Sequence, residues 1–347
     1  MAKAEWTLDP SDLLRVGPTF DLESFDRAST PGWDSGSKEA DQFRLSRGEL
    51  LSEMQERLFA NARAGGEQRI LLVLQGMDTA GKGGIVRHVA GMMDPQGLAI
   101  RSFGVPTEEE RSHHYLWRIR NALPSAGRIG IFDRSHYEDV LVVRVDQLAD
   151  VDWEERYAEI NRFEEEVAAS GTTIIKVALL VSYEEQGLRL MRRLQRPDKH
   201  WKFTSNDVDS RSKWDAYQHA YQEMLAHTST ENAPWYAIPA DNKWYARLAV
   251  TELVSQALAS LKLSWPEVAY DVETEKQRLA TTMDPEAVAK AREGAEEKRA
   301  DVAEDIEEYE EQVARVNELA ATDSLATLAE NGAKPAASPA KKSTGRG

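Results

Sequence analysis

The stretch LLVLQGMDTAGKGG, Leu71–Gly84, constrains this chain more than any other feature. An apolar run ends in a glycine-rich turn, in which Gly76, Gly81 and Lys82 fit the phosphate-loop pattern G-x-x-x-x-G-K. A strand that leads into such a turn and then into a helix presents backbone N–H groups to a phosphate. The sequence therefore predicts a phosphate-binding loop after a buried strand, with an ordinary glycine-rich turn as the alternative.

Two positions of this loop depart from the usual pattern. Gly83 stands where a Ser or Thr commonly holds magnesium, and Asp78 places a carboxylate inside the loop. A carboxylate that faces a phosphate is repelled unless a cation lies between them. We therefore expect Asp78 to bind a magnesium ion, directly or through water, that bridges to the phosphate. The alternative is a solvated turn residue or a helix cap.

The rest of the chain alternates between apolar segments and helical patterns, which predicts the α/β class with a parallel sheet covered by helices on both faces. The helical pattern that precedes the first strand is Leu45–Arg63. The expected strands are Ile70–Gln75, Leu98–Phe103, Ile129–Phe132, Thr173–Val181 and Trp235–Ile238.

Composition along the chain predicts four regions. Residues 1–45 form an irregular N-terminal arm rich in Asp, Pro, Gly and Ser, and residues 46–266 form the phosphate-loop domain, with a lid around 183–212. Residues 267–330 are a charged helical extension, which we interpret as solvated although apolar residues recur at 4-3-4-3 spacing from Val302 to Val316. Residues 331–347 are a disordered tail by composition.

Charge and composition exclude several function classes. The formal net charge of −16 argues against a general nucleic-acid binder. The chain has no cysteine, which excludes disulfides, thiolate metal sites and cysteine nucleophiles. The start MAKAEWTLDP has no apolar run that could act as a signal peptide, and no 18-residue apolar stretch follows. We expect a cytoplasmic protein that binds neither nucleic acid nor membrane.

A second candidate for the site follows the strand at Ile129–Phe132. It ends in Asp133-Arg134, within GRIGIFDRSHYEDVLVVRV. Ligands of open parallel sheets gather at the carboxyl ends of the strands. Asp133 is therefore expected to bind the metal or to act as a base near the acceptor, and Arg134 to point toward the phosphates. A simple salt bridge or cap is the alternative.

Basic residues gather in the segment YEEQGLRLMRRLQRPDKHWKF, Tyr183–Phe203. We interpret this segment as a mobile lid that closes over transferring phosphates, neutralises them and excludes water. The alternative is a solvated charged face. Its basic side chains are those of Arg189, Arg192, Arg193, Arg196, Lys199 and Lys202.

Four motifs in this order, GMDTAGKGG, FDRSHYEDVLVVRV, RPDKHWKF and STENAPWYAIPADNKWYARL, resemble the polyphosphate kinase 2 family, and the resemblance covers roughly residues 12–265. It implies a thymidylate-kinase-like P-loop kinase fold, a three-layer α/β/α arrangement with a helical lid. It also implies reversible phosphate transfer between inorganic polyphosphate and a nucleoside di- or monophosphate (ADP, GDP or AMP). The family uses magnesium, with manganese as the alternative ion, and forms homo-oligomers, here a dimer or a tetramer.

The resemblance also implies roles for individual residues. The implied catalytic residues are Asp78, Lys82, Asp133, Arg134 and Arg193, and the metal ligands among them are Asp78 and Asp133. The implied phosphate- and nucleotide-binding residues are Gly76, Gly81, Gly83, Arg118, Glu138, Arg189, Lys199 and Lys202.

One residue departs from the family pattern. Members that act on nucleoside mono- and diphosphates commonly carry Asn at the position of Asp133, so the preferred acceptor stays open. Two other functions also stay open: an ATP-dependent nucleotide or small-molecule kinase of the same fold, and a non-catalytic regulator that binds polyphosphate or nucleotide.

Overall fold

A computed structural model describes residues 5–293 and 304–315 of the chain. Its centre is a sheet of five parallel strands in the order β2-β3-β1-β4-β5. The strands are β1 Arg69–Gln75, β2 Leu98–Ser102, β3 Ile129–Asp133, β4 Thr172–Leu180 and β5 Trp235–Pro239. These bounds confirm all five expected strands to within a residue. The middle strand β1 is buried on both faces because helices cover the sheet from either side.

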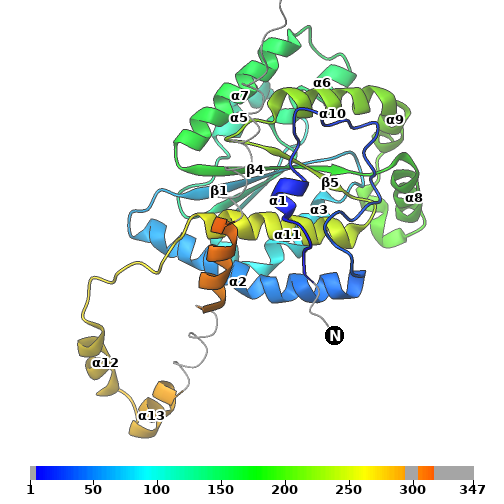
Figure 1. Ribbon diagram of the computed structural model, residues 1–347. Coiled ribbons are helices and arrows are strands. Elements are labelled where there is room, and N and C mark those ends of the chain that lie inside the picture. Colours follow the sequence, from blue (N-terminus) through cyan, green and yellow to red (C-terminus); the bar gives the residue numbers. More distant parts are fainter. Residues whose placement is uncertain (1–4, 294–303, 316–347) are drawn as a thin grey trace, which may run out of the picture.

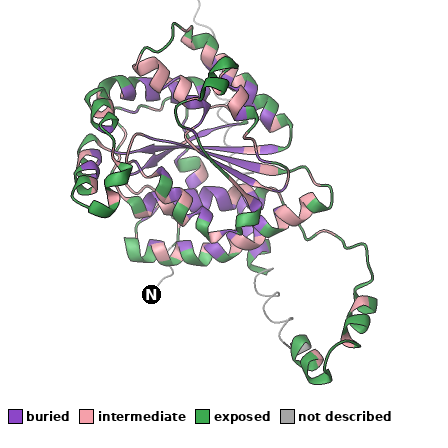
Figure 2. Ribbon diagram, turned by 180° about the vertical axis from the view of Figure 1, so that it is seen from behind, coloured by how far each residue is buried: buried purple, intermediate pink, exposed green. Residues whose placement is uncertain are grey.

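Helices cover the two faces of the sheet in separate layers (Figure 1). On one face α3 (Lys82–His88) and α11 (Lys243–Ser260) pack against the strands, and α2 (Ser37–Arg63) packs against α11. On the other face lie α7 (Trp153–Ala169) and α10 (Trp214–Thr228). The strands and the inner sides of these helices are buried in both layers, as Figure 2 shows. The predicted three-layer α/β/α architecture is confirmed.

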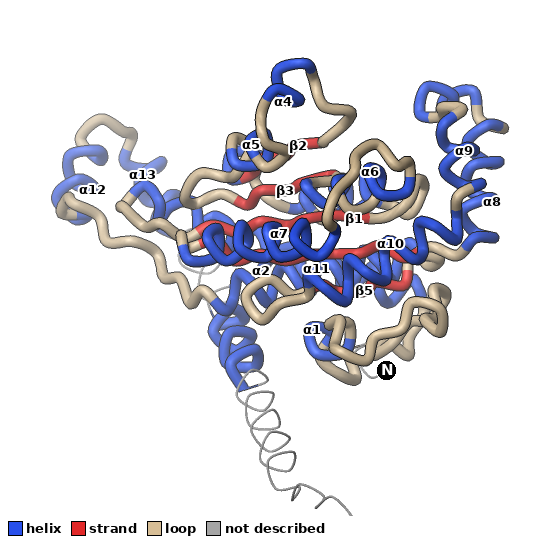
Figure 3. The backbone as a smooth tube through the Cα atoms, turned by 90° about the horizontal axis from the view of Figure 1, so that it is seen from above, coloured by secondary structure: helices blue, strands red, loops and turns tan. Residues whose placement is uncertain are grey.

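Short helices complete the connections. They are α1 Pro10–Leu13, η1 Ala90–Met92, η2 Pro95–Gly97, α4 Glu108–Ser112, α5 Trp117–Arg120, η3 His136–Asp139 and α6 Val142–Val145. The segment expected to form the lid consists of α8 Tyr183–Leu194, η4 Pro197–Lys202 and α9 Asn206–Ser212. Figure 3 shows α8 and α9 projecting at the end of the sheet where the strands β1 and β4 finish. Within the described part of the chain, no helix is both long enough and apolar enough to span a membrane.

The N-terminal arm is shorter and more tightly packed than the sequence predicted. Helix α2 begins at Ser37 rather than Leu45, so the interpretation of residues 37–45 as irregular is wrong. Ala40 and Arg44 continue the buried face of the helix by one turn each. The irregular residues before it still bury Leu14 and Trp33 in the core. The side chain of Trp33 supplies packing that no local pattern revealed.

The interpretation of the C-terminal extension as a solvated helix is wrong for residues 304–315. These residues are helical, and Ile306, Tyr309 and Val313 are buried in the same core cluster as α2 and α11. Their 4-3 spacing had been visible, but the surface that receives them had not. Two further helices, α12 (Val272–Ala280) and α13 (Pro285–Glu293), precede them. The predicted tail, 331–347, lies outside the described residues.

A buried ion pair links the sheet to its covering layer. The Nζ of Lys176, in the middle of β4, donates to the carboxylate of Glu164 on α7 at 2.6 Å and to the carbonyl of Thr228 at 2.6 Å. The hydroxyl of Tyr137 donates to the same carboxylate at 2.7 Å. Burial opposes ionisation of Glu164, but the Lys176 ammonium and His136 together outweigh it and hold the pKa of this carboxyl below its usual value.

Candidate active site

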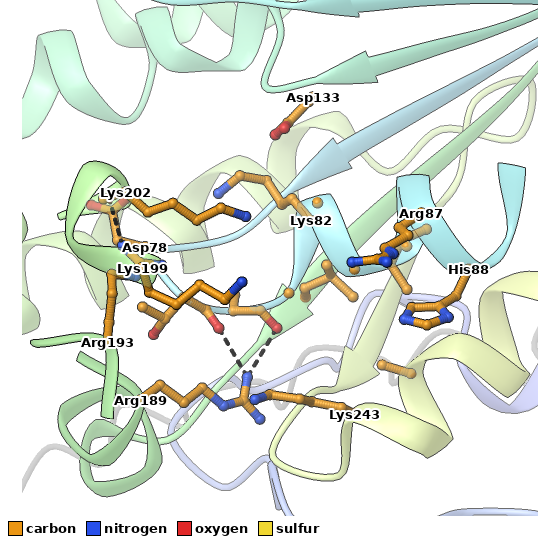
Figure 4. A pocket seen from close by; sticks show the side chains of 18 of the residues that line it. Asp78, Lys82, Arg87, His88, Asp133, Arg189, Arg193, Lys199, Lys202 and Lys243 are labelled. Atoms are coloured by element: carbon orange, nitrogen blue, oxygen red, sulfur yellow. Dashed lines mark hydrogen bonds between the residues drawn. The ribbon is translucent and has the colours of Figure 1, made fainter. Parts of the chain in front are cut away.

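A large cavity lies at the carboxyl ends of β1, β3 and β4, where ligands of open parallel sheets bind. It has a volume of about 910 Å³ and lies between the loop after β1, helix α3, the lid and the beginning of α11 (Figure 4). Its charged side chains are Asp78, Lys82, Arg87, Asp133, Arg134, Arg189, Arg192, Arg193, Arg196, Lys199, Lys202, Lys243 and Arg247.

The loop after β1 has the backbone geometry that close approach of a phosphate requires. Gly81 has φ 127°, a conformation that side chains with a Cβ rarely adopt. A Cβ at Gly76 would lie 2.8 Å from the carbonyl oxygen of Leu179, so β4 leaves room only for glycine there. By contrast a Cβ at Gly83 would meet nothing within 4 Å. That position therefore faces the open cavity at the first turn of α3.

Lys82 lies at the floor of the cavity. Its Nζ donates to the carbonyl of Gly76 and, at 3.4 Å, to that of Met77. Burial lowers the pKa of Lys82, and the nearby Arg134 lowers it further, against the pull of Asp78, Asp133 and Glu138. The loop thus holds a desolvated cation directly beneath the space that a phosphate would fill.

The loop after β1 and the end of β3 meet through an ion pair. Because β1 and β3 are neighbours in register, with Leu74 beside Asp133, the residues that follow each strand come together. The guanidinium of Arg134 donates to the carboxylate of Asp78 at 3.2 Å and lies 4.0 Å from that of Glu138. Arg134 has φ 65°, which turns the chain sharply after the strand.

The carboxylates of Asp78 and Asp133 fit a magnesium site in which the substrate supplies some of the ligands. Magnesium commonly binds one or two carboxylates and takes its other ligands from phosphates and water. Both carboxylates line the cavity, on either side of Lys82, as Figure 4 shows. Among the described residues no group of three His, Cys, Asp or Glu side chains could form a complete protein cage for a metal. The donor set is thus one that leaves most coordination positions to oxygens of a phosphate.

The turn that follows Asp133 is anchored from below by the buried ion pair. Ser135 caps η3, whose residues His136 and Tyr137 both contact the carboxylate of Glu164. The next residue, Glu138, points back to the sheet and accepts a hydrogen bond from Gln75 at 3.2 Å. Burial raises the pKa of the Glu138 carboxyl, although Arg134 and Lys82 counteract it.

Arg189 ties the lid to the phosphate loop. Its guanidinium donates to the carbonyls of Thr79 at 3.0 Å and Ala80 at 3.2 Å, and to those of Ala240 at 2.6 Å and Asp241 at 2.8 Å. The side chain is buried, and its Nε bonds to Glu185. The sequence predicted a phosphate ligand here, but these contacts favour a role in positioning the loop.

The other predicted lid residues surround the cavity mouth. Arg193 pairs with Asp207 at 3.1 Å and donates to the carbonyl of Lys202 at 3.0 Å, so it joins α8 to α9 and η4. Lys199 pairs with Asp198 at 3.0 Å, and the ammonium of Lys202 lies over the exposed ring of Trp201. These cations occupy the part of the cavity that is open to solvent.

Three predicted site residues do not line this cavity. Gly76 lies beneath the loop, and Glu138 lies behind Lys82 at the end of β1. Arg118 donates to the carbonyl of Gly104 at 2.9 Å and pairs with Glu110 at 3.5 Å. It braces the loop after β2, whose residues Phe103 and Gly104 do line the cavity.

Sequence reasoning missed the basic residues that α3 and α11 contribute to the cavity. Arg87 lies on the last turn of α3, and Lys243 and Arg247 lie one turn apart at the start of α11. Burial and the neighbouring Arg189 lower the pKa of Lys243, as expected for a cation surrounded by like charge. The sequence did contain a signal for Lys243. It lies just after the carboxyl end of β5, and Asp133 lies at the carboxyl end of β3, so the same rule applied to both.

The cavity is strongly basic in an acidic protein. Of the described residues that line it, eleven are Lys or Arg and two are Asp, whereas the whole chain carries a net charge of −16. Several positive charges facing one space repel each other unless an anion fills it. A ligand with many negative charges along its length matches this arrangement better than a single phosphate.

Comparison with known proteins agrees with this geometry. The model of the family described as "Polyphosphate kinase 2 (PPK2)" matches residues 35–264. The chain belongs to the polyphosphate kinase 2 family. The matched part begins just before α2 and ends after α11, so it contains the sheet, the phosphate loop and the lid.

Individual members of the polyphosphate kinase 2 family are similar over most of their length. The AMP/ADP-polyphosphate phosphotransferase of Meiothermus ruber is 42% identical over 256 residues, which are 73% of this chain and 94% of that protein. The ADP-polyphosphate phosphotransferase of Rhodopseudomonas palustris is 41% identical and covers 63% of this chain and 79% of its own. The crystal structure of polyphosphate kinase 2 from Arthrobacter aurescens TC1 is 47% identical with a TM-score of 0.79, covering 81% of this chain and all of the other.

Proposed function

We propose that this protein is an enzyme that transfers a phosphoryl group between inorganic polyphosphate and a nucleoside mono- or diphosphate, in either direction. The observation that carries the proposal is the continuous basic cavity that begins at the phosphate loop and extends between the lid and α11. Polyphosphate carries negative charge along its whole length, so it pairs with cations on both walls. The names of the relatives from Meiothermus ruber and Rhodopseudomonas palustris support the same reaction.

In this proposal polyphosphate is the donor that occupies the cavity. Its terminal phosphate lies against the loop at Gly81 and Gly83, with the Lys82 ammonium beside it. Phosphoryl transfer needs little covalent chemistry from a protein, because position and charge stabilisation suffice. Lys82, Arg134 and the lid cations provide this charge, and closure of the lid over the bound substrates would exclude water from them.

The carboxylates of Asp78 and Asp133 hold the divalent ion in this proposal, which we take to be magnesium, with manganese as the alternative. When bound, the ion neutralises charge on the phosphate that is transferred. Arg134 pairs with Asp78 in the structure, so its guanidinium already lies beside the carboxylate that faces the bound phosphate in this proposal. Asp133 ends β3 on the acceptor side, where it orients the attacking phosphate of the nucleotide.

The shape of the cavity favours polyphosphate over ATP as the donor. A purine ring needs an apolar or aromatic slot. Of the described residues that line the cavity, only Phe103 and His88 carry rings, and Phe103 is buried beneath the surface. Cationic side chains occupy most of the remaining lining. If ATP were the donor in this cavity, its adenine base would lie among these cations.

One experiment separates the two donors. The purified protein is incubated with magnesium and either polyphosphate plus ADP or polyphosphate plus AMP, and nucleotides are resolved by chromatography. The proposal expects ATP from ADP, and ADP or ATP from AMP. The absence of product with polyphosphate, together with transfer from ATP to a monophosphate, would establish the alternative donor. Parallel reactions with GMP and GDP define the range of acceptors.

A further inference from the structure

Residues 304–315 pack on a site that is built from both α2 and α11. The side chains of Ile306, Tyr309 and Val313 enter the core cluster that these helices form. Their spacing places them on one face of the short helix. The residues lie beyond the family match, which ends at residue 264. The two helices that form the site lie inside the family match, whereas the residues that dock on it lie outside.

A polar contact at the centre of this site specifies Tyr309. Glu252 of α11 is buried, and its two carboxylate oxygens have different partners. One accepts a hydrogen bond from Arg47 of α2 at 3.1 Å, and the other accepts one from the Tyr309 hydroxyl at 3.0 Å. The Arg47 guanidinium also lies 4.0 Å from the centre of the Tyr309 ring. A carboxylate buried in this way needs both partners, so the site selects a helix with a tyrosine at this position.

Residues 261–265 still contact α2, but the segment that follows them does not pack on the body. No residue from 266 to 291 is buried, and α12 and α13 stand away from the layers of the fold in Figures 1 and 3. The segment nevertheless exposes large apolar side chains, and these are Val268, Tyr270, Val272, Leu279 and Met283. Apolar side chains left exposed in this way are available to contact another protein.

We propose that this segment is an exchange arm, through which residues 304–315 of one copy dock on α2 and α11 of a second copy. An arm that is not fixed to its own body can deliver the same helix to a partner with the same contacts, which is the usual route to an exchanged dimer. Two arms that cross in opposite directions also bring their apolar side chains together. This arrangement covers the surface that a single copy leaves exposed.

The exchange would connect the subunits to the cavity. Helix α11 carries Lys243 and Arg247 at its start and Glu252 one turn later. Helix α2 carries Arg47, and one turn before it Arg44 donates to the carbonyl of His88, which lines the cavity. The partner's helix would thus rest on the two helices that support the basic wall. The docking itself is independent of which reaction the cavity performs.

Cysteine cross-linking tests the proposal, because the natural chain has no cysteine. Glu310 lies close enough to Arg57 of α2 for their charges to interact, and neither residue makes the anchoring contacts. Two full-length chains are co-expressed, one carrying Arg57→Cys with an affinity tag and the other carrying Glu310→Cys without it. The purified complex is treated with a homobifunctional maleimide, and cross-linked peptides are identified by mass spectrometry.

Exchange predicts a covalent species that contains one tagged and one untagged chain, joined between positions 57 and 310. The same species should be lost when the untagged chain also carries Ile306→Asp, which places a charge in the apolar core between this helix, α2 and α11. It should persist with Gln312→Asp, because Gln312 is on the exposed side of the same helix. A chain that carries both Arg57→Cys and Glu310→Cys tests the opposite case, in which each copy docks its own helix. If that chain cross-links only within itself and the mixed chains do not, or if neither reacts, the proposal is overturned.

Discussion

The guanidinium of Arg134 lies 3.2 Å from the carboxylate of Asp78 and so joins the end of β3 to the phosphate loop after β1. The two residues are far apart in sequence, and they meet because β1 and β3 pair in register. Each had been assigned a role in phosphate transfer on separate grounds. Their contact joins the position of the loop to the charge at the second strand end, and in our proposal both act on the bound ion.

The first prediction concerns Asp78. Replacing it by Asn keeps the shape of the side chain but removes the charge that a divalent ion needs. We expect kcat with polyphosphate and nucleotide to fall by at least about 100-fold, the scale of losing one electrostatic contact to a transition state. The side chain lies at the surface of the cavity, so we expect Tm to stay within about 2 °C of the wild type. Rates are measured over a magnesium titration, alongside Tm.

The control for Asp78→Asn is Asp150→Asn, since Asp150 is an exposed carboxylate that does not line the cavity. This variant should keep the wild-type rate. A rate close to that of the wild type for Asp78→Asn at saturating magnesium would contradict the assignment of Asp78 as a metal ligand.

The second prediction distinguishes two arginines of the same helix. Arg189 donates to carbonyls of the phosphate loop and of the turn after β5, whereas the side chain of Arg192 is 61% exposed. Lysine keeps the charge but cannot form the planar fork of hydrogen bonds. Arg189→Lys should therefore destabilise the fold by about 2–3 kcal/mol and lower Tm by about 3–5 °C.

Arg192→Lys is the matched substitution, and it should leave Tm nearly unchanged. Both variants are compared by thermal unfolding and by kcat, and Arg189→Lys should also lose turnover because the loop is no longer held. Equal Tm values for the two variants would show that the contacts of Arg189 with the loop do not stabilise the protein.

The sequence was sufficient to predict the sheet and the centre of the site. Each strand is a continuous apolar run, because β1 and its neighbours are covered on both faces, and such runs are visible without tertiary information. The phosphate loop is likewise local, since Gly76, Gly81 and Lys82 lie within one turn between a strand and a helix. These features depend on neighbours in the sequence.

The features that the sequence did not predict depend on distant partners. The 4-3 spacing of apolar residues in 304–315 is visible in the sequence. Only the contacts with Glu252 and Arg47 show that this face is buried and not solvated. Similarly, Lys243 and Arg247 read in the sequence as the start of an ordinary helix, and only the order of the strands places that helix start at the cavity. Arg189 was assigned to phosphate because its carbonyl partners come from two other segments.

The third prediction tests the wall that the sequence analysis missed. Lys243→Ala and Arg247→Ala should each raise KM for polyphosphate with little change in kcat, and the double variant should raise it roughly 10-fold, equivalent to about 1.4 kcal/mol. The reason is that these cations line the α11 side of the cavity and, in our proposal, attract the part of the polyanion beyond the transferred phosphate. The difference from the wild type should shrink as salt is added, because ions screen the attraction.

Steady-state kinetics with long-chain polyphosphate at low and high ionic strength measures this effect. Lys213→Ala is the matched control, because Lys213 pairs with Asp146 and does not line the cavity. If the KM values of the cavity variants match that of Lys213→Ala, the polyphosphate does not extend along α11.

The fourth prediction concerns the buried pair of Glu164 and Lys176 beneath the second strand end. Because the folded protein holds the pKa of Glu164 below its usual value of 4.5, ionised Glu164 stabilises the fold above that pH. This contribution is lost as the pH falls below 4.5 toward the lower pKa of the folded state. Glu164→Gln leaves the Lys176 ammonium buried without its counter-charge and should cost about 3–5 kcal/mol at neutral pH.

Urea unfolding from about pH 7 to about pH 4 measures the free energy of unfolding of the wild type, Glu164→Gln and the double variant Glu164→Gln/Lys176→Met. The double variant should be more stable than Glu164→Gln, because it removes the unpaired charge together with its partner. The advantage of the wild type over Glu164→Gln should narrow below pH 4.5, since only the wild type takes up a proton at Glu164 on unfolding. Parallel pH curves, with the single and double variants equally destabilised, would mean that Glu164 is not ionised in the folded protein. In that case hydrogen bonds to Tyr137 and His136, and not the ion pair, would hold the turn that carries Glu138.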